Sequence, residues 1–111
     1  MENDCIFCKI SNGEIPTDFL LENEHLVVFR DINPHAPVHL LVVPRRHIRS
    51  INDLTDFSDG EIVSEMILTA RDMAIRESVS KSGYKLLFNV EKGGGQVVFH
   101  LHLHLIGGWK P

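Results

Sequence analysis

The segment Phe99–Ile106 constrains this chain more than any other, because histidine and leucine alternate along it. Side chains of a β-strand point alternately to the two faces of a sheet, so every second residue shares a face. Leu101, Leu103 and Leu105 would then share one face. His100, His102 and His104 would share the other, roughly 6.5–7 Å apart at about 3.3 Å per residue. The pattern predicts a sheet that buries its leucine face and presents a row of ionisable nitrogens on the other.

Further strands follow from apolar, β-branched runs bounded by turn residues. Strands are predicted over residues 19–22, 25–30, 38–43, 84–90 and 98–106. Asn23-Glu24 predicts a tight hairpin between the first two, and Pro44 ends the third, which reads as a buried strand.

Two helices are expected beside these strands. Residues 5–12 favour a short helical turn. A capping-box signature at Ser58 and Glu61, followed by apolar residues at helical spacing, predicts one long helix that ends at Ser82-Gly83. With mostly antiparallel strands, the elements indicate a single α+β domain over residues 1–111.

Composition and charge exclude several classes of protein. Fifteen acidic and eleven basic residues give a net charge of −4, whereas binding to nucleic acid or to an anionic membrane usually uses a net basic surface. No apolar run reaches the length of a transmembrane helix. The acidic N-terminus lacks the basic region of a secretory signal. We therefore expect a cytoplasmic protein with neither a nucleic acid nor a membrane as partner.

The histidine row admits three interpretations: a half-exposed strand that uses histidine as its polar residue, a metal-binding strip, or a catalytic site with one imidazole as nucleophile. The Gly93–Gln96 segment, Gly-Gly-Gly-Gln, precedes the row. Glycines allow close approach to an anion and present N–H donors to it. Next to three histidines, this segment favours catalysis on a phosphate group.

The spacing Cys5-x-x-Cys8 admits a redox pair, half of a metal site, or two small packed residues. No strand precedes it, which disfavours a thioredoxin-like redox motif. A structural disulfide is not expected in a reducing compartment.

These motifs together resemble the histidine triad (HIT) family of nucleotide hydrolases and transferases. HLHLHLI is similar to the family signature, and DINPHAPVHLLVVPRRHI, over residues 31–48, is similar to its central block. Asn89 with GGGQ resembles the phosphate-binding segment, and CIFCKISNGEIP resembles the N-terminus of many bacterial members. The resemblance spans about residues 5–109, and the nearest branch is the purine-nucleoside phosphoramidase group.

The resemblance implies an antiparallel sheet with a long helix, paired into a homodimer. It implies that His102 attacks the α-phosphorus of a purine nucleotide ester or amide and forms a nucleotidyl-histidine, and that His104 contacts the phosphate or the leaving group. It assigns the phosphate to Asn89, Gly95, Gln96 and His104. It assigns the nucleoside to Phe7, Ile10, Ile15, Phe29, Asp31 and Ile32, with Asp31 on the ribose hydroxyls. The apolar members of that set are equally credible as core residues.

One position departs from the branch. The residue after the glutamine is commonly Ser or Thr, whose hydroxyl helps to protonate the leaving group, and here it is Val97. Protonation of an amine leaving group would then fall to His104 or to water.

Structural zinc is expected on a Cys₂His₂ set. Four N and S ligands form the closed tetrahedral pattern of structural zinc sites, and several bacterial members of the family carry zinc on this constellation. The set is Cys5, Cys8, His47 and His100. Without zinc, the two histidines would be hydrogen-bond partners; His39 reads as a satisfied hydrogen-bond partner rather than a ligand.

Three other functions remain open from the sequence. One is a regulatory module that binds a purine nucleotide with little turnover, and another is a dinucleoside polyphosphate hydrolase. The third is a metal-handling protein that uses the histidine row directly. A metal carrier needs neither the Gly-Gly-Gly-Gln segment nor Asp31, which disfavours the third function. Of the remaining interpretations, we expect a hydrolase of purine nucleotide phosphoramidates or related esters.

Overall fold

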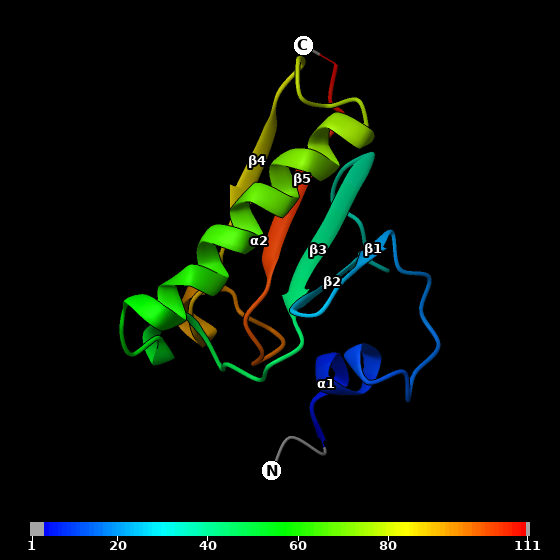
Figure 1. Ribbon diagram of the computed structural model, residues 1–111. Helices are drawn as coiled ribbons and strands as arrows, with labels where there is room; N and C mark the ends of the chain where they lie inside the picture. The colour runs from blue at the N-terminus through cyan, green and yellow to red at the C-terminus, as the bar shows by residue number, and fades with distance from the viewer. Residues whose placement is uncertain (1–3, 111) are drawn as a thin grey trace.

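A five-stranded antiparallel sheet forms the centre of the protein, in a computed structural model that describes residues 4–110 (Figure 1). The predicted domain boundaries, 1 and 111, lie outside these residues. The strand order is β1-β2-β3-β5-β4, and each neighbouring pair is antiparallel. The strands are β1 Leu21–Glu22, β2 Leu26–Arg30, β3 Val38–Pro44, β4 Tyr84–Leu87 and β5 Leu103–Gly107.

The two helices pack on the sheet with different partners. The long helix α2 (Phe57–Arg76) runs across β3, β4 and β5, whereas the short α1 (Ile6–Ser11) contacts β3 (Figure 1). Alternate residues of β2 show why both faces are covered: Leu26 and Val28 belong to the cluster that includes Met66 of α2, and Val27 and Phe29 belong to the cluster that includes Phe7. The α+β prediction is confirmed. Neither α1 nor α2 is long and apolar enough to cross a membrane.

The start of α2 differs from its prediction by two residues. Asp56, not Ser58, is the N-cap, and its carboxylate accepts from the backbone N–H of Asp59 at 3.0 Å. The Asp59 carboxylate accepts from the N–H and hydroxyl of Thr55, one residue before the cap. Asp56 and Asp59 thus bind the backbone at the start of the helix, the role predicted for Ser58 and Glu61. The Thr55 hydrogen bonds and Arg46 lower the pKa of Asp59 to about 2.

The end of α2 comes earlier than predicted. The helix ends at Arg76, not at Ser82-Gly83, because Ser78 adopts a left-handed φ of 63°. The N–H of Val79 donates to the carbonyl of Ala74, and the N–H of Ser78 donates to that of Ile75, which is the Schellman pattern. The sequence did not predict this end, because the left-handed residue that ends a helix is usually glycine and here it is serine.

Three strands begin later or end earlier than predicted. β4 ends at Leu87 rather than residue 90, β1 begins at Leu21 rather than residue 19, and β5 begins at Leu103 rather than residue 98. The leucine face is confirmed, since Leu101, Leu103 and Leu105 all pack in the α2 cluster. The shared histidine strand is wrong, because His100 and His102 precede β5.

Pro44 explains why the pairing between β3 and β5 does not continue back to His100. Proline has no N–H for a sheet ladder, and the carbonyl of Pro44 accepts instead from the ring of His100 at 2.7 Å. The backbone N–H of Leu101 donates to Ile48 beyond the strand. The chain therefore joins the sheet only after His102, at Leu103.

Candidate functional site

His102 and His104 lie together at the beginning of β5. Their ring centroids are 4.9 Å apart, and the ring of Phe7 from α1 meets His102 edge-on at 5.0 Å. His102 is only 8% exposed and His100 is fully buried. The expectation that His102 lies on a solvent-facing strand surface is therefore wrong, since α1 covers it.

The proton of His102 can be assigned from its hydrogen bond. Its Nδ1 lies 2.7 Å from the carbonyl oxygen of His100, which can only accept. Nδ1 therefore carries the hydrogen, and in the neutral ring the Nε2 atom keeps its lone pair. This is the tautomer that a nitrogen nucleophile requires.

A chain of hydrogen bonds assigns the opposite tautomer to His104. The backbone N–H of His35 donates to Nδ1 of His39 at 3.0 Å, so neutral His39 carries its hydrogen on Nε2. That hydrogen is directed to Nδ1 of His104, 2.9 Å away, which must accept. His104 therefore carries its hydrogen on Nε2. This buried atom has no hydrogen-bond partner among residues 4–110 and can donate to a bound group.

Burial keeps both rings neutral. Loss of hydration, together with the neighbouring His102 and His39, lowers the pKa of His104 to about 4. Loss of hydration also lowers the pKa of His102, against the opposing hydrogen bond to the His100 carbonyl. The site thus pairs an unprotonated nitrogen with a neutral N–H donor near pH 7.

Most of the residues predicted for the nucleoside gather on the α1 side of the sheet. Phe7, Ile10 and Phe29 are buried in one apolar cluster, against which Ile15 packs. Asp31 follows β2, and its carboxylate lies 3.4 Å from Nε2 of His39. Ile32 stands apart from this cluster and is 90% exposed.

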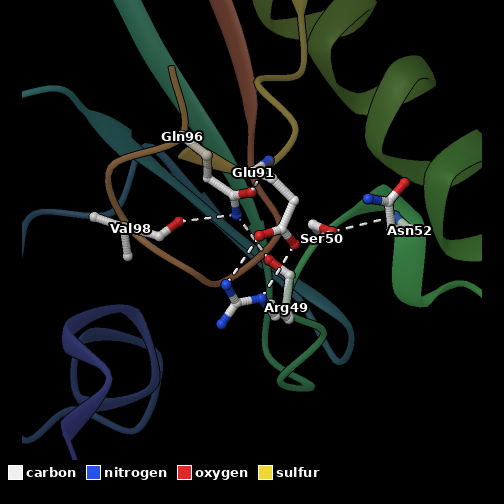
Figure 2. Close-up of polar contacts among 6 residues, drawn as sticks. All are labelled: Arg49, Ser50, Asn52, Glu91, Gln96 and Val98. Carbon is white, nitrogen blue, oxygen red and sulfur yellow. Dashed lines mark hydrogen bonds and ion pairs between the residues drawn. The ribbon is translucent and has the colours of Figure 1, made fainter. Parts of the chain in front are cut away.

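Three of the four residues predicted for the phosphate, Asn89, Gly95 and Gln96, lie on the loop between β4 and β5, and the fourth, His104, lies in β5. Gly95 has a φ of 88°, and a side chain there would meet the amide of Asn89 at 3.8 Å. The side chain of Gln96 is occupied by the protein itself: its NH₂ donates to the carbonyls of Arg49 and Val98, and its oxygen accepts from the N–H of Glu91 (Figure 2). Gln96 therefore shapes the loop. Val97 is 85% exposed beside it.

The four predicted metal ligands converge on one point. Nδ1 of His100 lies 3.3 Å from Cys5 Sγ, 3.5 Å from Cys8 Sγ and 3.2 Å from Nδ1 of His47. Cys8 Sγ lies 3.4 Å from Nδ1 of His47. Tetrahedral zinc with ordinary bond lengths would space two nitrogens about 3.3 Å apart, and a nitrogen and a sulfur about 3.6 Å apart.

The donor chemistry agrees with the spacing. Nε2 of His100 donates to the Pro44 carbonyl, so Nδ1 of the neutral ring presents its lone pair to the cysteines. Burial lowers the pKa of His100 to about 4, which keeps that lone pair available. The cluster could hold a metal ion, and its four donors fit zinc.

Sequence reasoning missed two parts of the site. The sequence predicted that His39 has a hydrogen-bond partner, but it did not predict that this partner is His104. Its place in the apolar Val38–Val43 run was the available signal. The ion pair between Arg49 and Glu91 had no signal, because the two residues are 42 positions apart in the chain.

Comparison with known proteins is consistent with this geometry. Residues 12–110 match the HIT domain. The chain is 38% identical over 108 residues to the purine nucleoside phosphoramidase of Escherichia coli strain K12, which covers 97% of this chain and 90% of that protein. This chain belongs to the HIT family.

Solved structures agree. A HIT family hydrolase from Legionella pneumophila Philadelphia 1 superposes with a TM-score of 0.92 at 48% identity, over 96% of this chain and 94% of that one. A histidine triad protein from Clostridium difficile superposes with a TM-score of 0.94 at 40% identity, over 100% and 96%. The family and these relatives support a function like that of a nucleotide hydrolase.

Proposed function

We propose that this protein hydrolyses purine nucleoside phosphoramidates, or related nucleotide esters, through a nucleotidyl-histidine on His102. The observation that carries the proposal is the pair of opposite tautomers. His102 has a lone pair on Nε2, and His104, 4.9 Å away between ring centroids, has a hydrogen on Nε2. One ring is prepared to attack and the other to donate.

The reaction divides into two displacements. In the first, Nε2 of His102 forms a bond to the α-phosphorus as the bond to the leaving amine or oxygen breaks, and the leaving group takes a proton from water. In the second, water attacks phosphorus and breaks the P–N bond. This step releases the mononucleotide, returns the neutral ring with its hydrogen on Nδ1, and gives the proton lost by the attacking water to the solvent. Donors that face the phosphoryl oxygens stabilise the charge in both transition states.

His104 is the proposed donor to the phosphate or the leaving group. Its Nε2–H is buried and unpaired among the described residues, and Val97 offers no hydroxyl for the purpose. We propose that Asn89, Gly95 and Gln96 complete the phosphate site, with Gln96 acting through the shape of the loop. The nucleoside site is proposed on Phe7, Ile10, Ile15, Phe29, Asp31 and Ile32.

Zinc is proposed as a structural ion on Cys5, Cys8, His47 and His100. With four protein ligands, it has no open position for a substrate and would supply folding free energy rather than chemistry. The chain itself holds the other side of the His100 ring through the hydrogen bond to Pro44. His100 is two residues before the proposed nucleophile. We also propose that the protein works in the cytoplasm, where its thiols stay reduced.

A homodimer is proposed on the outer side of α2. Ile67, Leu68 and Ile75 are 41%, 50% and 60% exposed on this helix. A second copy would cover these side chains.

The nucleophile can be tested by intact-protein mass spectrometry after rapid quenching with an adenosine phosphoramidate. Wild-type protein should gain the mass of one adenylate, located on His102 by peptide fragmentation. His102→Ala should lose the adduct and turnover, whereas the control His25→Ala, at an exposed surface histidine, should keep both. Turnover like that of wild type in His102→Ala would remove His102 as nucleophile. Tight nucleotide binding with neither adduct nor turnover in wild type would favour a regulatory module.

A further inference from the structure

Glu91 has an unusual backbone conformation in the loop that carries Asn89, Gly95 and Gln96. Its φ of 59° and ψ of 174° fall in a region that is normally reserved for glycine. A non-glycine residue stays there only when its surroundings hold it. Glu91 is therefore a place where the fold imposes a specific shape on the loop.

The Glu91 side chain is held by the segment that follows β3. Arg49 donates from Nε and Nη2 to the two carboxylate oxygens at 3.1 and 2.9 Å, and the Ser50 hydroxyl donates at 3.1 Å (Figure 2). The Arg49 hydrogen bonds lower the pKa of Glu91, so the carboxylate is charged near pH 7. A two-pronged guanidinium–carboxylate pair fixes orientation as well as distance.

The Glu91 backbone is held by the loop itself. Its N–H donates to the side-chain oxygen of Gln96 at 2.7 Å, and its carbonyl accepts from the N–H groups of Gly94 and Gln96. Gln96 in turn donates to the carbonyl of Arg49 at 2.7 Å. Arg49 and Gln96 therefore enclose Glu91 from two sides.

Arg49 also reaches the far end of the loop. Its guanidinium carbon lies 4.4 Å from the centre of the Phe99 ring, one residue before His100. The same arginine thus contacts Glu91, just after Asn89, and Phe99, just before the histidines. One side chain connects both ends of the segment that we assign to the phosphate.

We propose that Glu91, held by Arg49, is a positioning residue that sets the phosphate-binding loop in its working shape. This inference rests on the proposed function, because it gives the loop of that same site its geometry. The pair touches neither the nucleoside cluster nor the two catalytic rings in the described structure. It should therefore affect recognition of the phosphate and spare recognition of the nucleoside.

Binding of AMP and of adenosine, measured by calorimetry, separates these two effects. Glu91→Gln keeps the size of the side chain but removes the charge that Arg49 binds. We expect it to weaken AMP binding about tenfold, as small displacements in a positioned site do, and to change adenosine binding less than twofold. The matched control is Asp72→Asn, which removes an exposed carboxylate paired with Arg71 and should change neither.

A second variant distinguishes a lost positioning effect from a loss of folding. Glu91→Gly has no Cβ and tolerates the positive φ, so it should fold at least as well as wild type while still losing affinity for AMP. Equal AMP affinity in wild type and in both variants, or equal losses for AMP and adenosine, would overturn the inference. If wild-type protein binds adenosine but gains nothing from the phosphate of AMP, the proposed function fails, and this inference fails with it.

Discussion

The three histidines of the His-x-His-x-His run are chemically different, although they are equally spaced in the sequence. His100 donates from Nε2 to Pro44, His102 donates from Nδ1 to His100, and His104 accepts at Nδ1 from His39. Each hydrogen bond fixes which nitrogen keeps a lone pair. The lone pair of His100 therefore faces the cysteines, and the hydrogen on Nε2 of His104 is left for a ligand.

The tautomer of His104 can be tested by nitrogen-15 NMR. Between pH 6 and 8 we expect a neutral ring with its hydrogen on Nε2, because Nδ1 accepts from His39. Burial places its pKa near 4, below the usual 6.5, so the ring should stay neutral at pH 5.5. The unfolded chain then binds more protons than the folded one between pH 6.5 and 4, and this histidine makes stability fall as the pH falls through that window.

His25 provides the internal control for this titration. It is exposed, and its hydrogen bond to Glu65 raises its pKa above 6.5. It should therefore titrate at a higher pH than His104 in the same sample. A His104 ring that carries its hydrogen on Nδ1, or that titrates together with His25, would contradict the hydrogen-bond chain.

At the scale of elements, the end of α2 offers a test of backbone strain. Ser78 has a φ of 63° at the residue where the Schellman motif usually has glycine. Ser78→Gly should raise the free energy of unfolding by about 0.5–1 kcal/mol, since relief of the left-handed conformation exceeds the added freedom of the unfolded chain. Urea denaturation measures the difference.

The exposed Ser82 supplies the matched substitution, because its φ is not positive. Ser82→Gly should leave stability unchanged or slightly lower, since glycine there only loosens the unfolded chain. A destabilised Ser78→Gly protein would show that the serine side chain contributes more than its backbone costs.

The sequence predicts the elements better than their ends. Periodicity identified the buried strand, the leucine face and the long helix, because each depends on which side chains face the core. It could not locate the end of α2, where Ser78 adopts the conformation of a glycine. It also extended β5 back to residue 98, because alternation continues through His100 although β3 no longer pairs with that segment.

The candidate site shows the same division. Short-range motifs placed Cys5 with Cys8 and His102 beside His104, and the family resemblance added His47 and His100 to the cysteines. The roles of His39 and Glu91 depend on contacts between segments that are 65 and 42 residues apart. Contacts between such distant segments leave no pattern of neighbouring residues from which a single sequence could predict them.

At the scale of the whole molecule, the outer side of α2 predicts the oligomeric state. Sedimentation at micromolar concentration should show a dimer of the 12.6 kDa chain, and Leu68→Lys should shift it toward monomer by placing a charge among Ile67 and Ile75. Ile32→Lys, at a side chain that is 90% exposed after β2, should leave the dimer intact. A wild-type monomer would contradict the proposed interface.

Zinc would connect α1 to the two segments that follow β3 and precede β5. The cysteines lie at the start of α1, His47 follows β3, and His100 precedes β5. Because the unfolded chain cannot hold all four ligands together, zinc affinity adds to the free energy of unfolding. Protein purified without a histidine tag should contain about one zinc per chain by elemental analysis.

Removal of the metal should therefore act on stability before it acts on chemistry. A strong chelator should lower the Tm of wild-type protein by about 5 °C or more, and Cys5→Ser should lower it comparably without chelator. The chelator should have no further effect on Cys5→Ser, because both changes remove the same ion. Turnover at 25 °C should fall only indirectly, because four protein ligands leave zinc no position for substrate. The size of the fall depends on how far His100, and with it His102, moves when zinc is removed. Protein without zinc, whose Tm responds to neither zinc nor chelator, would leave the cysteines as packing residues and His100 as a hydrogen-bond partner of Pro44.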